Sequence, residues 1–164
     1  MGTIRNIAVG LPVRDGHVLL SVGFDRVRQL GFHRAVGGGI EFGELAVEAL
    51  HREFREELDV AIEDAELLAV LENRFEFEGN PGHEVVHVFA VRSAVLDAVP
   101  LDAELVVLDE GSPVRWVPLD SDVPVFPPGV LDLLRHRLRE ARTTVTTAAV
   151  ASPEPATPTS MPSV

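Results

Sequence analysis

Residues 38–60 read GGIEFGELAVEALHREFREELDV, and the second half of this stretch has the composition of an amphipathic helix. Glu53, Glu56 and Glu57 stand three and four residues apart, so a helix would place their carboxylates on one side of its surface. Each such pair of like charges destabilises an isolated helix by roughly 0.2 to 0.5 kcal/mol unless a positive charge lies between them. Magnesium meets that need, because it takes oxygen ligands and binds through one or two carboxylates together with substrate phosphates.

A simpler interpretation is that these glutamates only form the solvent-exposed face of the helix. A glycine-rich segment directly before the helix argues against it. Glu41 and Glu44 are interleaved there with glycines, namely Gly37, Gly38, Gly39 and Gly43. Glycine allows backbone conformations closed to other residues and close approach of the main chain. The segment therefore predicts a sharply folded loop that leads a strand into the helix and leaves backbone groups near a bound ion.

The same stretch resembles the signature of the Nudix hydrolases, G-x5-E-x7-R-E-U-x-E-E-x-G-U, in which U is a bulky aliphatic or aromatic residue. The fixed positions of this signature are occupied by Gly38, Glu44, Arg52, Glu53, Phe54, Glu56, Glu57 and Val60. Asp59 stands where the family has glycine, just past the helix end. A left-handed residue usually ends a helix there, and aspartate is among the few side chains that adopt this conformation, so we expect a local cost of about 1 kcal/mol.

The resemblance implies an α/β fold, the Nudix-type α/β/α sandwich with a mixed central sheet. It also implies a hydrolase that cleaves the diphosphate linkage of a nucleoside diphosphate derivative by metal-activated water, with Mg²⁺ as cofactor and Mn²⁺ as a substitute. By the same resemblance Glu53, Glu56 and Glu57 are metal ligands and catalytic groups, with Glu53 or a glutamate from a later loop as general base. Gly38 is expected at both the metal and the substrate, and Gly39 at the substrate.

Residues outside the signature supply further candidates. Arg34, just before the glycines, could grip phosphate oxygens bidentately, although a solvated surface arginine fits this position equally well. Glu104 and Glu110 both lie where Nudix enzymes often supply an extra ligand or base, and the sequence does not choose between them. Arg52 and Glu44 are expected to form a structural ion pair that ties the glycine segment to the helix.

The substrate beyond its diphosphate stays open at this point. Several aromatic residues are candidates for stacking on a nucleobase, although core or cleft wall is the expected role of each: Phe24, Phe32, Phe75, Phe77 and Trp116. Sugar nucleotides, dinucleoside polyphosphates, ADP-ribose and damaged nucleotides all fit the signature, because similarity of fold does not separate them.

Two other functional classes compete with hydrolysis of a diphosphate. His83-Glu84-Val85-Val86-His87 has the H-E-x-x-H pattern of zinc proteases, which requires a helix to bring both histidines to one zinc. Asn80-Pro81-Gly82 suggests a turn and residues 85–91 are apolar and rich in valine, so we expect a strand, on which the histidines would lie roughly 13 Å apart. A Nudix-fold module that binds nucleotides without cleaving them is disfavoured, because it would not need every acidic position.

The amino-acid composition limits the kinds of molecule that this protein is expected to bind. Lys and Arg number 14 against 26 Asp and Glu, and the net charge of -12 disfavours nucleic acid or an anionic membrane while allowing a small nucleotide bridged by metal. The chain has no cysteine, which excludes disulfides, thiol catalysis and thiolate metal sites.

No signal-peptide or membrane-spanning pattern occurs, so we expect a cytoplasmic protein. A homodimer is a further expectation, because dimers are common among such enzymes.

The patterns along the chain predict one domain over residues 1–142 and a disordered tail, rich in Thr, Ser, Pro and Ala, over residues 143–164. Within the domain we expect a hairpin turning at Asp15-Gly16, further strands and two helices. The expected ranges are 4–13, 17–22, 67–73, 85–92 and 114–119 for strands, 34–41 for a strand and loop, and 43–58 and 130–142 for helices.

Overall fold

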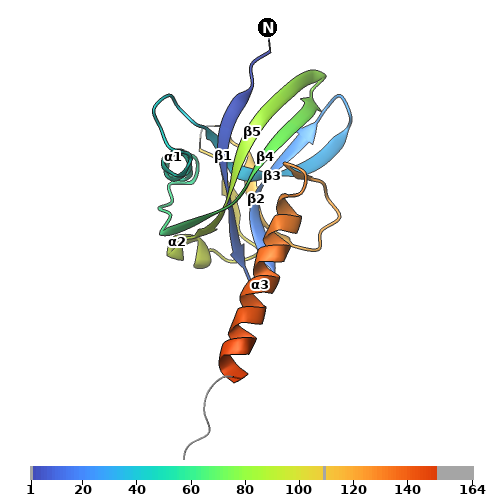
Figure 1. The fold of residues 1–164 in the computed structure, drawn as a ribbon. Coiled ribbons are helices and arrows are strands. Elements are labelled where there is room, and N and C mark those ends of the chain that lie inside the picture. Colours follow the sequence, from blue (N-terminus) through green and yellow to red (C-terminus); the bar gives the residue numbers. More distant parts are fainter. Residues whose placement is uncertain (1, 109, 151–164) are drawn as a thin grey trace, which may run out of the picture.

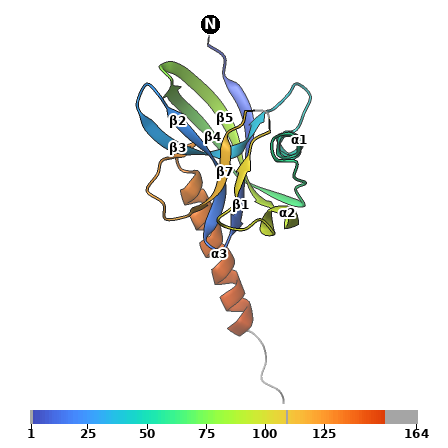
Figure 2. The same cartoon turned by 180° about the vertical axis from the view of Figure 1, so that it is seen from behind.

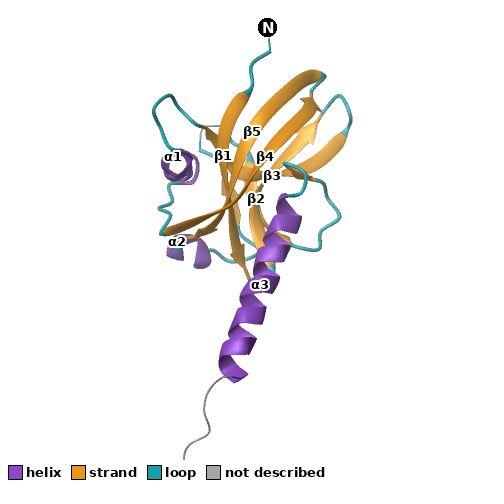
Figure 3. Ribbon diagram, viewed as in Figure 1, coloured by secondary structure: helices purple, strands orange, loops and turns teal. Residues whose placement is uncertain are grey.

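The computed structural model describes residues 2–108 and 110–150, with side chains as far as Ala141. Its strands are β1 (Arg5–Arg14), β2 (His17–Asp25), β3 (Leu30–Gly39), β4 (Asp64–Phe77), β5 (Asn80–Arg92), β6 (Glu104–Val106), β7 (Pro113–Pro118) and β8 (Val125–Phe126). Its helices are α1 (Ala46–Leu58), α2 (Ala94–Asp97) and α3 (Val130–Val150). Figure 3 shows how the strands gather at the centre of the fold with the helices outside them.

The strands form one mixed sheet in the order β4-β5-β1-β3-β2-β7-β6, with β8 paired to β3. β1 runs parallel to β5, and β3 runs parallel to β8, whereas the other pairs are antiparallel. Helices α1 and α3 lie on opposite sides of this sheet in both views (Figures 1 and 2). The predicted α/β/α sandwich with a mixed central sheet is therefore confirmed.

The sheet is apolar on both faces because each face is covered by a helix. The cluster beneath α1 includes Ala8, Val36, Leu50, Phe54 and Trp116. The cluster beneath α3 includes Ile7, Val9, Ala35, Val130 and Leu134. Adjacent residues such as Ala8 and Val9 fall into different clusters because successive side chains of a strand point to opposite faces.

Helix α1 forms where the hydrophobic spacing predicts it and buries Ala49, Leu50 and Phe54 completely. It begins at Ala46, later than the predicted Gly43, because Gly43 has a positive φ of 86° and belongs to the turn that precedes the helix. The apolar side of the helix thus faces the sheet, and of its glutamates Glu48 and Glu56 are exposed whereas Glu57 is buried.

The C-terminus of α1 has the geometry expected from the sequence. Asp59 adopts the left-handed conformation with φ 54° and ψ 39°, and its N–H donates to the carbonyl of Arg55 at 3.1 Å. The N–H of Val60 donates to the carbonyl of Phe54 at 3.2 Å, so two carbonyls of the last turn are satisfied. Asp59 therefore ends α1 in the left-handed conformation, the role expected of the glycine in the family signature.

The sequence predicted the position of one hairpin turn correctly and that of another incorrectly. Asp15 and Gly16 form the β1–β2 turn with φ of 48° and 74°, as predicted. The turn assigned to Asn80-Pro81-Gly82 is wrong, because those residues pair within β5 and the chain turns earlier at Glu78 and Gly79, with φ of 51° and 77°. The glutamate–glycine pair reaches the positive φ values that this tight turn requires.

The C-terminal helix α3 is longer than predicted, since it continues to Val150 rather than ending near Arg142. The predicted disordered tail thus loses residues 143–150 to the helix, and the rest of it, residues 151–164, lies outside the described residues. No helix in the described part of the chain is both long and apolar enough to cross a bilayer.

We predict that Asp59→Gly raises the free energy of unfolding by about 1 kcal/mol, because glycine adopts the left-handed conformation without a Cβ penalty. Urea denaturation at neutral pH measures this difference. Asp59→Ala is the matched control and should be less stable than the native protein, since alanine lacks the local hydrogen bonding that helps aspartate adopt positive φ. A glycine variant no more stable than the native chain would contradict the prediction.

Candidate active site

Arg52 lies at the centre of the Nudix signature and binds both the helix and the segment before it. Its Nε and Nη2 donate to the two carboxylate oxygens of Glu44, both at 2.9 Å, and Nη2 also donates to the carbonyl of Gly39 at 2.8 Å. Its Nη1 donates to Glu53 Oε1 at 2.8 Å and to Glu56 Oε2 at 3.1 Å. The expected Arg52–Glu44 pair is present, and the same guanidinium screens two of the signature glutamates.

The charges of this network reinforce one another. The hydrogen bonds from Arg52 hold the pKa of the Glu44 carboxyl below its ordinary value. The hydrogen bonds to Glu44, and then those to Glu53 and Glu56, raise the pKa of Arg52 further above the physiological range. Glu44 is thereby kept ionised and Arg52 kept charged, so the link between the loop and α1 is a charge-assisted, bidentate one.

Gly38 and Glu53 are in direct contact across the gap between β3 and α1. A Cβ added at Gly38 would lie 2.5 Å from the carboxylate carbon of Glu53, a distance too short for two nonbonded atoms. A side chain at this position would displace the carboxylate from where it lies, and the Glu53 side chain is 13% exposed. The structure therefore brings together two residues that the signature predicts for one site.

The three signature glutamates are not equivalent. Glu56 is open to solvent and Glu53 is partly covered, whereas Glu57 is buried against the body of the fold. In the residues the structure describes, no group of three or more histidine, aspartate or glutamate side chains is placed to hold a metal ion. The assignment of Glu53, Glu56, Glu57 and Gly38 to a metal site stays a prediction.

Two of the signature carboxylates nevertheless lie around the same guanidinium nitrogen. One oxygen of Glu53 and one of Glu56 accept from Nη1 of Arg52 at 2.8 and 3.1 Å, and the Glu53 carboxylate also lies beside Gly38. Magnesium typically needs only one or two carboxylates when phosphates and waters complete its shell. The chemistry of this donor pair matches that requirement.

The structure distinguishes the two later glutamates. Glu110 Oε2 lies 3.3 Å from Nη2 of Arg34, and its loop is docked on α1 because the N–H of Leu108 donates to the carbonyl of Glu57 at 2.9 Å. Glu104 instead forms an ion pair with Arg115, its cross-strand neighbour on β7. Glu110 is therefore the later carboxylate that lies beside the candidate phosphate ligand Arg34.

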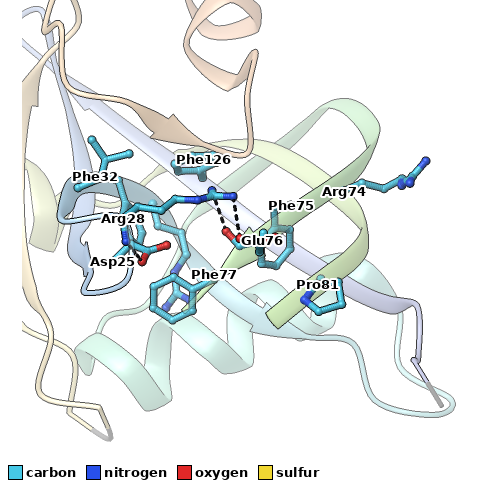
Figure 4. A pocket seen from close by; sticks show the side chains of 12 residues that line it. Asp25, Arg28, Phe32, Arg74, Phe75, Glu76, Phe77, Pro81 and Phe126 are labelled. Carbon is cyan, nitrogen blue, oxygen red and sulfur yellow. Dashed lines mark hydrogen bonds and ion pairs between the residues drawn. The ribbon is translucent and has the colours of Figure 1, made fainter. Parts of the chain in front are cut away.

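Two adjoining cavities lie next to this cluster. The smaller, about 70 Å³, is lined by Arg34, Gly38, Phe75 and eight other residues, among them the buried Asn73 and Glu84. The larger, about 730 Å³, shares Arg34 and Phe75 with it and is otherwise mostly apolar. Figure 4 shows its wall, which includes Phe32, Phe75, Phe77 and Phe126. The cavities thus lead from Gly38, beside Glu53, to a pocket rich in phenylalanine.

Three of these phenylalanines, Phe32, Phe75 and Phe77, are stacking candidates predicted from the sequence, but Phe126 is not among those candidates. This residue lies on the two-residue strand β8, where it pairs with Arg34, and its ring packs edge-on against Phe32 with centroids 5.5 Å apart. So short a strand has no detectable period in the sequence. The carbonyl of Gly39 accepts from Arg52, and the role of Gly39 at the substrate stays a prediction, whereas Phe24 and Trp116 do not line either cavity.

The zinc-protease alternative is wrong on geometry. His83, Glu84 and His87 all lie within β5, so the two histidines are separated along an extended strand rather than stacked on a helix. His83 Nε2 is 2.8 Å from a carboxylate oxygen of Glu72, and Glu84 lies 3.6 Å from Arg5. The pattern is one of ordinary sheet residues, with Glu84 at the wall of the smaller cavity.

We predict that Glu44→Gln lowers the free energy of unfolding at neutral pH, and that the difference from the native protein shrinks on acidification. The folded state lowers the pKa of Glu44, so its stabilising contribution is present above the ordinary carboxyl pKa and is lost as the pH falls through the lowered value. Urea denaturation over a pH series measures both effects. Glu41→Gln, at an exposed position of the same loop, is the control, and a difference independent of pH would contradict the prediction.

Comparison with protein-family models matches residues 4–130 to the NUDIX domain. Similar solved structures include a MutT NUDIX hydrolase from Burkholderia pseudomallei, with 24% identity, a TM-score of 0.57 and coverage of 80% of this chain and 96% of that one. A NUDIX hydrolase from Nitrosomonas europaea has 17% identity, a TM-score of 0.60 and coverage of 84% and 90%. An ADP compounds hydrolase has 18% identity, a TM-score of 0.55 and coverage of 85% and 76%. A search of curated proteins found no match.

Because the family match spans most of the sequence and includes the whole signature, this chain belongs to the Nudix family and is a pyrophosphohydrolase acting on acid anhydrides.

Proposed function

We propose that this enzyme cleaves the diphosphate linkage of a nucleoside diphosphate derivative, with Mg²⁺ as cofactor and Mn²⁺ as a substitute. The observation that supports the proposal is that Glu53 and Glu56 both accept from one nitrogen of Arg52, with the Glu53 carboxylate directly beside Gly38. A net charge of -12 would repel a free nucleotide, so a cation held between the carboxylates and the phosphates is the natural bridge.

The chemistry assigns separate tasks to the residues of the site. A phosphoanhydride resists water because its oxygens are anionic, so a catalyst must neutralise charge, position water in line and stabilise the leaving phosphate. A bound divalent cation would supply the neutralisation and lower the pKa of a bound water. Glu53 and Glu56 would hold that cation, and Arg34 would grip a phosphate oxygen. Glu110, which neighbours Arg34, and Glu53 are then the two candidates for the general base.

The remainder of the substrate is proposed to occupy the larger cavity. Arg34 and Phe75 belong to both cavities, so a diphosphate gripped by Arg34 would direct its nucleoside toward the phenylalanine-lined wall. Apolar faces of this kind suit a flat nucleobase. The substrate is thus proposed to be a small nucleotide derivative rather than a nucleic acid, handled in the cytoplasm and away from membranes.

We predict that Glu56→Gln lowers kcat/KM by about 100-fold or more with Mg²⁺, because it removes a charge needed at the cation while preserving side-chain volume. Hydrolysis of a broad nucleotide panel with Mg²⁺ or Mn²⁺, with products identified, measures the loss. Thermal unfolding establishes that the variant is folded.

Glu48→Gln is the matched control on the same helix. The Glu48 carboxylate accepts the N–H of Leu45 at 2.8 Å, and the amide oxygen of glutamine can keep that bond, so activity should stay within about twofold of the native enzyme. An undiminished rate in Glu56→Gln would defeat the proposed role. Failure of the native enzyme to release any product from the panel would favour a nucleotide-binding module instead.

A further inference from the structure

The larger cavity lies between two hairpins that are distant in sequence, β2–β3 and β4–β5 (Figure 4). Their tips are joined by polar contacts that we call the hairpin clasp, made by Asp25, Arg26, Arg28, Glu76 and Glu78. The N–H of Arg26 donates to a carboxylate oxygen of Glu78 at 2.8 Å. The guanidinium of Arg28 donates to the carboxylate and to the carbonyl of Glu76, each at 3.1 Å. These contacts fix the position of one hairpin relative to the other.

Asp25 is the buried member of the hairpin clasp, with 4% of its surface exposed. Its Oδ1 accepts the N–H groups of Val27 and Arg28, each at 2.9 Å, and its Oδ2 accepts the N–H of Glu78 on the opposite hairpin at 3.4 Å. The ion pairs of the clasp are solvent-exposed and individually weak. Asp25 is therefore the buried group through which the clasp contacts both hairpins at once.

Each hairpin also carries a phenylalanine that lies over a cross-strand glycine. Phe32 pairs with Gly23, and a Cβ added at Gly23 would lie 2.3 Å from the Phe32 ring. Phe75 pairs with Gly82, where an added Cβ would likewise lie 2.3 Å from the ring. Both rings settle onto bare backbone, and this arrangement keeps the space between the hairpins open.

The two rings differ in what else they contact. Phe32 is wedged edge-on between Phe77 and Phe126, with centroids 5.8 and 5.5 Å away, so it forms a fixed wall. Phe75 makes no such aromatic contact among the described residues and is held in place by the backbone of Gly82 beneath it. Phe75 is also the ring that borders both cavities, so it lies where the smaller cavity meets the larger one.

We propose that the two phenylalanine–glycine pairs, set at a fixed separation by the hairpin clasp, form a slot that selects the substrate by its planar ring, and that Gly82 and Asp25 are specificity-determining positions. The inference rests on the proposed function, since it assigns the slot to the base of the nucleotide whose diphosphate lies at Arg34. An aromatic base suits the part of this lining that the phenylalanine rings form, because the flat ring faces offer it apolar contact.

The first test is Gly82→Ala, compared with Gly31→Ala. At Gly82 the new methyl group would push the Phe75 ring into the slot, whereas at Gly31, on the neighbouring hairpin, a Cβ meets nothing within 4 Å. Gly82→Ala should raise KM for the best substrate of the panel by about tenfold or more, a change typical of altered fit in an apolar pocket, and leave kcat within about twofold. Gly31→Ala should change neither constant. Equal constants for the two variants would overturn the inference.

The second test is Asp25→Asn, which separates the hydrogen bonds that this carboxylate accepts within its own hairpin from the one that it accepts from the opposite hairpin. The amide oxygen can still accept from Val27 and Arg28, but the NH₂ group would face the N–H of Glu78 and release the opposite hairpin. Hydrogen exchange should become faster at the amide of Glu78, and the ratio of KM values between purine and pyrimidine substrates should move toward unity. Faster exchange with an unchanged ratio would contradict a selective role for the clasp.

A binding measurement separates this inference from the proposed reaction. Nucleosides, which carry no phosphate charge, are titrated into the native protein and both variants without metal and followed by amide chemical shifts. The native protein should show saturable shifts at Phe32, Phe75 and Gly82, with Kd raised about tenfold in Gly82→Ala. These shifts support the slot even if no substrate is hydrolysed, in which case only the proposed function fails. Absence of shifts at these residues up to millimolar nucleoside overturns the slot, whether or not the enzyme is active.

Discussion

The guanidinium of Arg52 is the constraint on which the rest of the site depends. It gathers the carboxylates of Glu44, Glu53 and Glu56 and the carbonyl of Gly39 around one planar group that is mostly shielded from solvent. Without that charge the glutamates would repel one another, and the glycine segment would lose its link to α1. Arginine suits this position better than lysine, because its five donors diverge in a fixed plane and can serve several acceptors at once.

This network also connects the signature residues to the two cavities. Arg52 presses Glu53 against Gly38, and Gly38 forms part of the smaller cavity, which opens through Arg34 and Phe75 toward the larger one. In the proposed function, the helix and the glycine segment would determine where a phosphate is attacked. The ends of the two hairpins would determine what is attached to it.

Local features of the fold were predictable from the sequence because short-range physics determines them. The three- and four-residue spacing of apolar side chains predicted α1, the Asp15–Gly16 pair predicted a tight turn, and Asp59 was expected to be left-handed. The turn near residue 80 was misplaced because Pro81 looked like a strand breaker, whereas it pairs near the start of β5, where a missing N–H is tolerated.

Long-range features of the site could not be predicted in the same way. Arg34 and Glu110 are 76 residues apart, and the hairpin clasp joins residues 48 and 52 positions apart, so no window of sequence contains both partners. The sequence did not choose between Glu104 and Glu110, because only tertiary structure shows that Glu110 lies beside Arg34 and that Glu104 pairs with Arg115. The buried position of Glu57 likewise follows from tertiary packing, not from the spacing of the signature.

Paramagnetic Mn²⁺ offers the most direct measurement of the central claim, that Glu53 and Glu56 converge to hold a divalent cation beside Gly38. Titration of substoichiometric Mn²⁺ into the isotope-labelled protein broadens the amide signals nearest to the bound ion. The account predicts that the amides of Gly38, Glu53 and Glu56 broaden first and that excess Mg²⁺ restores them. Broadening spread evenly over the acidic surface, or centred away from these residues, would contradict it.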